Sequence, residues 1–294
     1  MNTYPGLTRR RLLSSVPLLF GSSRLLAASA GKLFPGCQTN AWKIDPHDFS
    51  TFLRVLEQIR GFQFEGFETG FANVQMQFGN AVARQQIERF GLRFIGIHIF
   101  LSAYDPLTSI APASLYQRVA AGGAGLGADC LILSGAPVTS EERLNEPALH
   151  RKTRALMEAA RYAQRQGLRF AYHNETPECM VQGLEIKALV RETDPSLVGF
   201  LLDAGHAYQA GFDVPPFFRK NFKRIVGIHL RDYRGGQEVP LGQGNFDLGG
   251  LAKAVVQTGW SGWLIAEEDY SNGFKPGNSA INVARQSIRQ AFHI

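Results

Sequence analysis

The sequence is poor in cysteine, and the few cysteines it has are widely spaced. Only Cys37, Cys130 and Cys179 occur, and no two of them form a Cys-x-x-Cys pair. An odd number of distant thiols excludes a complete disulfide framework and gives no support to a structural zinc site. Cys37 and Cys130 fall in predicted strands, where a free cysteine behaves as a small apolar side chain. We therefore assign no redox or zinc role to the three thiols.

The chain also lacks the glycine loop of a nucleotide-binding protein. Its GGAGLG run at 122–127 follows a predicted helix instead of a strand, so these glycines miss the context in which backbone amides cradle a phosphate. No low-complexity tract and no linker rich in proline, serine or charge interrupts the sequence. These absences favour one globular body of enzyme size.

Residues 1–30 differ in composition from the rest of the chain. They contain the run TRRRLL at 8–13, an apolar stretch over 12–20 and the small-residue ending ASA at 28–30. This order resembles a twin-arginine export signal, and an uncleaved basic amphipathic start is the alternative. Nothing later approaches the roughly 20 apolar residues of a membrane span. We expect cleavage of 1–30, a mature domain over 31–294, a periplasmic location and no stable membrane anchor after cleavage.

Little net charge remains once this segment is set aside. The chain has 31 basic and 25 acidic residues, and four arginines but no acidic residue lie in 1–30, which leaves 27 against 25, or +2. DNA and RNA binding depends on clustered positive charge. We therefore expect no nucleic-acid partner.

From Leu33 onward, eight short apolar runs alternate with segments of helical period. Continuous apolar runs are typical of parallel strands that helices cover on both faces. Eight such units over 31–294 predict an α/β fold, a single (β/α)8 TIM barrel, with an open doubly wound sheet as the alternative. The expected strands read FPGCQTN, FEGFE, LRFIGIHI, ADCLILSG, LRFAYHNE, VGFLLDAGH, RIVGIHLRD and GWLIAEED.

Titratable side chains collect where six of these strands end, which is where the active sites of such barrels lie. Each alone could be a turn cap or an ordinary polar residue, and Glu268 and Asp269 are expected in a solvated loop. Several converging carboxylates and imidazoles, however, need a positive centre between them. We therefore predict one divalent cation, with Mn, Mg, Co, Fe and Zn equally compatible. The residues are Glu65, Glu68, His98, His173, Glu175, Asp203, His206, His229, Arg231, Asp232, Glu267, Glu268 and Asp269.

The segments LLDAGHAY, GIHLRDY, PLGQGNFDLGGL and WLIAEED resemble the sugar isomerase/epimerase superfamily with the xylose isomerase-like barrel. The resemblance extends over nearly the whole mature chain. It implies that Asp203, His229 and Glu267 bind the metal together with a carboxylate from the fifth strand, and that His206 contacts the substrate.

The fifth strand departs from the pattern of many relatives. It reads His173-Asn174-Glu175, and side chains two apart in a strand share a face, so either His173 or Glu175 could reach the ion. We choose Glu175 as the metal ligand because it preserves a carboxylate. His173 and Glu178 are the competitors.

The resemblance implies a metal-dependent isomerase or epimerase, and the expected export predicts that its substrate is an unphosphorylated or oxidised sugar. Glu175 and Glu267 would remove and return a proton next to a carbonyl through an enediolate, with His206 as a catalytic partner. Side chains expected to bind the substrate are His173, Arg231, His98 and Glu68. Aromatic residues expected either to wall the sugar site or merely to pack are Trp42, Phe71, Tyr104 and Trp263.

Three other functions compete with this one. A keto-sugar or inositol-type dehydratase or lyase, including one that cleaves 3-keto-glycosides, shares the barrel, the ion and the proton abstraction. An apurinic-site endonuclease shares the barrel and an Asp-x-x-His pair, but it needs more histidines and a more basic face than this mature chain offers. A non-catalytic sugar-binding barrel is the alternative outside enzymes. In each sugar-related case the partner is a small carbohydrate, and a homo-oligomer is compatible with the sequence.

Overall fold

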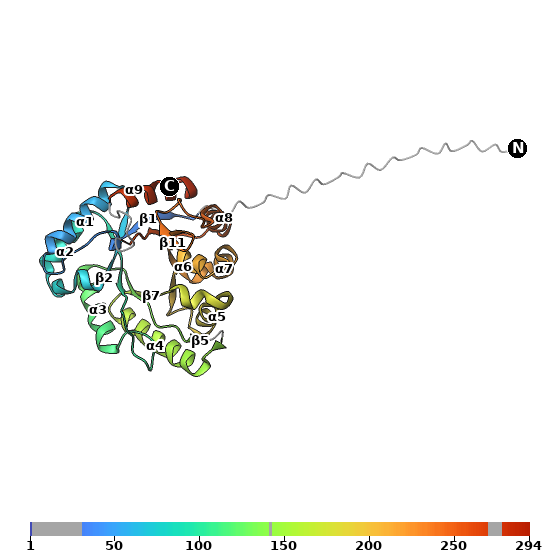
Figure 1. The fold of residues 1–294 in the computed structure, drawn as a ribbon, viewed down its shortest axis with the longest axis horizontal. Coiled ribbons are helices and arrows are strands. Elements are labelled where there is room, and N and C mark those ends of the chain that lie inside the picture. Colours follow the sequence, from blue (N-terminus) through green and yellow to red (C-terminus); the bar gives the residue numbers. More distant parts are fainter. Residues whose placement is uncertain (2–30, 141–142, 270–277) are drawn as a thin grey trace.

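A computed structural model describes Met1 and residues 31–140, 143–269 and 278–294 of the chain (Figure 1). The expected export signal falls almost wholly on 2–30, outside the described residues. Eight parallel strands close into a barrel in the order β1-β12-β9-β8-β7-β4-β3-β2, and helices surround it. The predicted single (β/α)8 barrel is confirmed.

The eight barrel strands coincide with the eight apolar runs, although most are shorter than expected. Each is buried along most of its length, since helices cover the outside of the barrel and side chains fill its inside. They are β1 (Leu33–Gln38), β2 (Gly66–Gly70), β3 (Arg93–Ile99), β4 (Cys130–Leu133), β7 (Arg169–His173), β8 (Gly199–Asp203), β9 (Ile225–Leu230) and β12 (Gly262–Ala266).

Four of the described helices begin at residues whose side chains cap free backbone amides. The side chains of Asp48, Asn80, Asn145 and Asp247 each accept a hydrogen bond from an amide in the first turn of the helix that follows. The helices of the described chain are α1 (Phe49–Gly61), α2 (Ala81–Glu88), α3 (Ala113–Leu126), α4 (Glu146–Arg165), α5 (Thr176–Glu192), α6 (Ala204–Gln209), α7 (Val214–Asn221), α8 (Leu248–Thr258) and α9 (Asn278–Phe292). None of them combines the length and apolar character needed to cross a bilayer.

Several short elements at the barrel mouth do not follow from the sequence pattern. The helix α6 begins directly at the end of β8, and α5 is interrupted at 180–183, where Val181, Gln182 and Gly183 have positive φ values. Two small antiparallel hairpins are formed by β5 (Thr139–Ser140) with β6 (Arg143–Leu144) and by β10 (Asp232–Arg234) with β11 (Gln237–Val239). All of these elements lie in the connections that follow the strands.

The apolar core has two parts. The larger lies between the barrel and its helices, and the smaller fills the barrel interior with residues that include Ile95, Leu201, Trp263 and Ile265. Trp263 thus packs inside the barrel against Phe34, 5.1 Å between ring centroids, and does not line the cavity described below. The three cysteines are buried and free, as their spacing predicts.

Candidate active site

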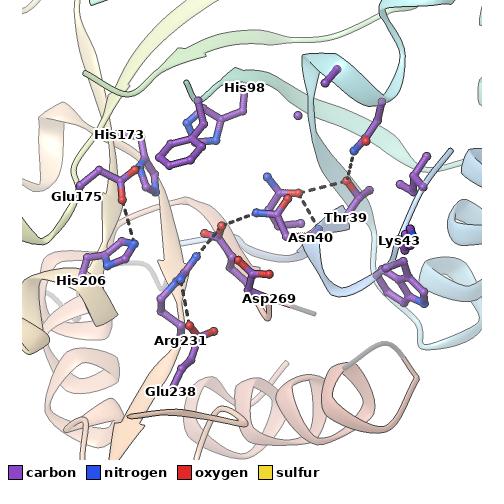
Figure 2. Close-up of a pocket in the computed structure, with 18 of the residues that line it drawn as sticks. Thr39, Asn40, Lys43, His98, His173, Glu175, His206, Arg231, Glu238 and Asp269 are labelled. Atoms are coloured by element: carbon purple, nitrogen blue, oxygen red, sulfur yellow. Dashed lines mark hydrogen bonds and ion pairs between the residues drawn. The ribbon is translucent and has the colours of Figure 1, made fainter. Parts of the chain in front are cut away.

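A cavity of about 1130 Å³ opens at the C-terminal ends of the barrel strands (Figure 2). One side of it is lined by His98, His173, Glu175, His206 and Arg231, all of which the sequence predicts as site residues. The opposite side is formed by the segments after β1 and β2. Its lining there is Gln38, Thr39, Asn40, Trp42, Lys43, Ile44, Gly70, Phe71, Ala72 and Asn73.

Four buried side chains at the base of this cavity could hold one metal ion. His173, Asp203 and His229 come from β7, β8 and β9, and Glu267 directly follows β12. Each offers one nitrogen or oxygen atom, and the four atoms lie within 4.8 Å of one another. Because metal bonds to such ligands are about 2.0–2.2 Å long, small side-chain adjustments suffice for one ion to reach all four. We call these four residues the ligand group.

The ligand group contains three of the four metal ligands expected from the sequence. Asp203, His229 and Glu267 converge as expected, whereas His173 takes the place for which Glu175 was chosen. The strand β7 ends at His173, so the alternation of side chains does not extend to Glu175, which caps α5. The other competitor, Glu178, is buried beneath the turn, where its carboxylate accepts a hydrogen bond from Tyr172.

Each histidine of the ligand group is held by a carboxylate behind it. His229 places Nδ1 3.0 Å from Nε2 of His173, and its own Nε2 lies 2.7 Å from Glu68 Oε2. Nδ1 of His173 lies 3.2 Å from Glu175 Oε1. Carboxylates commonly fix the ring orientation and tautomer of metal-binding histidines in this way. Glu68, expected to bind substrate, is fully buried behind His229 and does not line the cavity.

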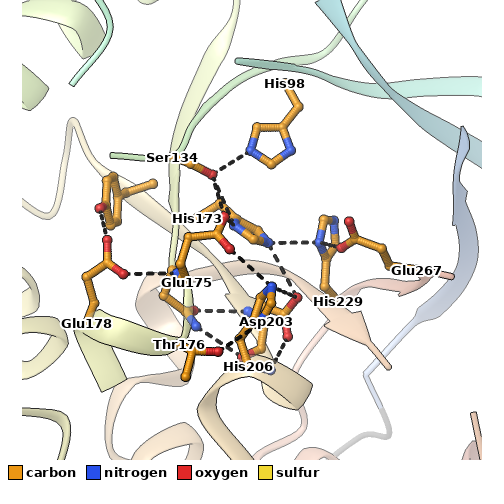
Figure 3. Close-up of polar contacts among 12 residues, drawn as sticks. His98, Ser134, His173, Glu175, Thr176, Glu178, Asp203, His206, His229 and Glu267 are labelled. Carbon is orange, nitrogen blue, oxygen red and sulfur yellow. Dashed lines mark hydrogen bonds and ion pairs between the residues drawn. The ribbon is translucent and has the colours of Figure 1, made fainter. Parts of the chain in front are cut away.

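Glu175 connects the ligand group to the cavity wall (Figure 3). Besides His173, it accepts a hydrogen bond from Ser134 Oγ at 3.0 Å and lies 3.1 Å from His206 Nε2. His206 Nδ1 in turn lies 3.0 Å from Thr176 Oγ1. The Glu175 side chain retains 22% exposure, whereas the carboxylate-bearing side chains of Asp203 and Glu267 retain 0% and 4%. Glu175 is therefore the acid of this cluster most accessible from the cavity.

The Asp-x-x-His spacing of the sixth strand has both a structural and a site role. Asp203 Oδ1 accepts a hydrogen bond from the His206 amide at 2.7 Å and thereby starts α6, while Oδ2 lies 3.6 Å from Nε2 of His173. The glycine between them is needed for packing, because a Cβ atom on Gly205 would lie 2.3 Å from Cγ of Arg231. Capping and convergence are thus properties of one short segment.

Arg231 supplies positive charge to the buried acids. Its Nε lies 3.1 Å from Asp203 Oδ2, and its Nη2 lies 2.6 Å from Glu267 Oε1. It also reaches Glu238 on the β10-β11 hairpin, with Nη1 3.4 Å from Oε2. One guanidinium therefore touches two acids of the ligand group and a third acid at the cavity wall.

The pKa values of the group follow from burial opposed by close charges. Burial raises the pKa of Glu68, but His229 and His98 outweigh it and lower the pKa to about 2. Burial lowers the pKa of His229, but Glu267 and Glu68 raise it to about 9. The acids hold protons on these rings, and a metal ion would have to displace them.

The donor set fits a divalent cation. Among the described residues, no hydrogen bond of good geometry reaches Asp203 Oδ2 or Glu267 Oε2, although both atoms are buried. Buried anionic oxygens are costly unless positive charge is close, and Arg231 beside Asp203 and the His229 ring beside Glu267 supply part of it. Two imidazoles and two carboxylates suit Zn, Mn, Fe or Co better than Mg, which prefers an all-oxygen shell.

At the barrel mouth, the sequence prediction was wrong for Glu268 and did not include Asn40. Glu268, expected in a solvated loop, is fully buried, and one of its oxygens accepts the Leu241 amide at 3.0 Å. Burial raises its pKa to about 8. Asn40, which the sequence did not single out, donates to Glu267 Oε1 at 3.0 Å. Its position at the end of the first strand was the available signal.

We expect the Glu68→Gln variant to bind zinc about ten-fold or more weakly, because loss of a carboxylate behind a ligating histidine typically costs 10–100-fold in affinity. Competition with a chromogenic chelator measures the affinity. Glu65→Gln, an exposed acid beside the same strand, is the matched control. Unchanged zinc affinity in Glu68→Gln would show that Glu68 does not orient His229.

Comparison with known proteins places this barrel among its relatives. Residues 56–291 match the model of a family described as the xylose isomerase-like TIM barrel. The chain belongs to the xylose isomerase-like TIM barrel family. Sugar-processing enzymes, among them epimerases and inosose dehydratases, are its relatives and structural neighbours.

The similarity to individual members of the family is low. Inosose dehydratase of Salmonella agona (strain SL483) is 30% identical over 127 residues, which cover 36% of this chain and 42% of that protein. The chain thus spans less than half of this relative. A structure of L-ribulose 3-epimerase aligns with a TM-score of 0.72 at 19% identity over 89% of this chain and 95% of the other. The IOLI protein, solved with a zinc atom, aligns with a TM-score of 0.71 at 15% identity over 88% and 98%. At such identities the two structures share the fold.

Proposed function

We propose that the protein is a metal-dependent carbohydrate isomerase or epimerase that removes a proton from the carbon next to a carbonyl group. The observation that carries this proposal is the position of Glu175. It faces the cavity from outside the ligand group, yet is hydrogen-bonded to the ligand-group residue His173. Burial raises the pKa of Glu175, but its contacts with His173 and His206 outweigh burial and hold the pKa well below its usual range, so this carboxylate is ionised. An ionised carboxylate that does not itself hold the ion can accept a proton beside it.

Three residues take part in the proposed proton transfer. Glu175 takes the proton from the substrate carbon, and His206, 3.1 Å away, shares it. Glu267 lies on the other side of His229 from Glu175 in Figure 3 and also lines the cavity, so a proton that it takes up from solvent there returns to the opposite face of the carbon. A sugar carbon that loses a proton on one face and gains one on the other is epimerised.

Binding and charge stabilisation fall to the remaining residues. A divalent ion held by His173, Asp203, His229 and Glu267 would polarise the carbonyl group and stabilise negative charge on its oxygen. Arg231 lines the same cavity and presents a fixed positive charge, and Asn40 and His98 supply hydrogen bonds. Neighbouring structures of an epimerase and of a zinc-bound protein support this proposal.

A dehydratase is the second candidate, and Glu238 is the observation that favours it. Burial raises the pKa of this cavity-lining acid to about 7 despite the nearby Arg231, so a substantial fraction is protonated at neutral pH. A protonated acid lining the same cavity as Glu175 could donate to a departing hydroxyl group, as water loss requires. The inosose dehydratase relatives agree with this candidate.

Incubation of the zinc- or manganese-loaded protein with a panel of free ketoses and keto-sugars in deuterated water tests the proposal. We expect deuterium to enter the recovered sugar at the carbon next to the carbonyl, because Glu175 exchanges its proton with solvent. The chelator-treated protein should give none. Loss of water without a recovered isomer would identify the dehydratase. Binding of the sugar without any exchange would contradict both reactions and support a binding barrel.

A further inference from the structure

The cavity is larger than the ligand group and its neighbours require. Ligand pockets of proteins are usually about 300–1,000 Å³ in volume and enclose molecules well above the size of one sugar ring. This cavity measures about 1130 Å³. Figure 2 shows Glu175, His173 and His206 on one side of it, and Thr39, Asn40 and Lys43 on the other. A single sugar held beside Glu175 would leave the second side unfilled.

The second side carries two aromatic rings from separate segments. Trp42 follows the short 3-10 helix Thr39–Ala41, and Phe71 begins the 3-10 helix Phe71–Asn73 after β2. Both rings are only partly buried and line the cavity. The indole of Trp42 is fixed because its Nε1 donates to Gln58 Oε1 on α1 at 2.8 Å. A ring fixed in this way offers apolar area at little cost in side-chain entropy.

Polar groups accompany these rings. Asn73 Nδ2 donates to Thr69 Oγ1 at 3.1 Å, which holds the amide at the cavity wall. Lys43 is exposed beside Trp42 and is free to turn towards a hydroxyl group. Apolar ring faces bordered by an amide group and an ammonium donor match a sugar ring, which has apolar C–H faces and a polar rim. We call Trp42, Lys43, Phe71 and Asn73 the outer subsite.

We propose that the outer subsite binds a second sugar ring, so that the substrate class is a disaccharide or glycoside. The reacting unit lies at the ligand group and Glu175, and its neighbouring ring lies on Trp42 and Phe71. Asn40 marks the boundary between the two, because it follows Thr39 on the outer side and donates to Glu267 of the ligand group. This inference rests on the proposed function for the placement of the reacting unit.

Calorimetric titration of the zinc-loaded full chain with fructose and with isomaltulose, a glucosyl-fructose whose carbonyl end is unsubstituted, tests the proposal. We expect isomaltulose to bind about ten-fold more tightly than fructose, a difference of about 1.4 kcal/mol, since its second ring would stack on the two aromatic faces. Trp42→Ala and, independently, Phe71→Ala should remove most of this advantage and leave fructose affinity unchanged. Met76→Ala, an exposed side chain near Phe71 but outside the cavity, should leave both affinities unchanged.

Three results would overturn the outer subsite. They are equal affinity for the two sugars, no measurable binding of isomaltulose, and equal loss for both sugars in the Trp42 and Phe71 variants that remain folded by circular dichroism. The third result would mean that the rings only support the fold. The proposed reaction is judged separately by deuterium exchange into fructose. Tight binding of isomaltulose without deuterium exchange would contradict the proposed reaction and still support the outer subsite.

Discussion

The Glu175→Gln variant should exchange deuterium 10²–10⁴-fold more slowly than the parent and still bind its metal ion. Glutamine keeps the size of the side chain and can still accept the hydrogen bond from Ser134, but it cannot take a proton from carbon. The rate is followed by mass spectrometry of the recovered sugar, at a metal concentration that saturates the site. Elemental analysis of the same sample gives the metal content.

The His173→Ala variant separates the two assignments for this strand. Because His173 belongs to the ligand group, its loss should remove both the bound metal and the exchange. Glu57→Gln, on the exposed face of α1, should change neither. A metal-free Glu175→Gln protein beside a metal-loaded His173→Ala protein would reverse the assignment and make Glu175 the ligand.

The barrel could be read from the sequence because its signals are local. Apolar runs such as that ending at Asp203 reflect strands covered on both sides, and caps such as Asp48 and Asn145 mark where helices begin. The helix α6 and the β10-β11 hairpin were missed because they are only a few residues long. Elements of that length are determined by contacts with distant segments, such as those that Asp232 makes to the amides of Gly242 and Gly244.

The sequence predicted those site residues that lie at the ends of the barrel strands. Asp203, His229 and Glu267 were expected to converge, and they do. The choice between His173 and Glu175 depended on which residue ends the strand, and two residues on one strand face give no signal for that. Glu268 is buried because a loop more than twenty residues earlier brings the Leu241 amide to it, which no local pattern reveals.

Two predictions remain outside the described structure. The export signal falls on 2–30. The proposed periplasmic location and the proposed unphosphorylated substrate both depend on that signal. The outer subsite is compatible with an uncharged second sugar. Lys43 and Arg231 are nevertheless cationic, so sugar phosphates belong in the substrate panel as a comparison.

A buried lysine, Lys152, lies beneath the turn that follows β7. In the sequence it interrupts the apolar pattern of α4. In α4, buried apolar residues recur at Leu149, Leu156 and Ala160, and Lys152 lies in the same stripe. A charged residue there is unusual, because lysine is almost never fully buried without a partner. The partners are two acids of α5, Glu178 and Glu185, which are themselves fully buried.

The contacts of Lys152 link this cluster to the active site. Its Nζ donates to Glu185 Oε1 and to the Ala136 carbonyl, both at 2.8 Å, and lies 3.5 Å from Glu178 Oε1. The other oxygen of Glu178 accepts the amide of Glu175 at 3.2 Å. The lysine therefore neutralises the acid that holds the turn carrying the proposed base.

We expect Lys152→Met to lower the free energy of unfolding by about 3–5 kcal/mol, because removing one partner leaves buried carboxylates without a counter-charge. Urea denaturation followed by circular dichroism measures the loss. Lys253→Met on the exposed face of α8 should stay within about 0.5 kcal/mol of the parent. The double variant Lys152→Met/Glu185→Gln lacks one of the two uncompensated carboxylates, so it should regain part of the lost free energy of unfolding. A Lys152→Met protein as stable as the parent would mean that the two acids are protonated in the fold, and that the lysine does not hold the Glu175 turn by charge.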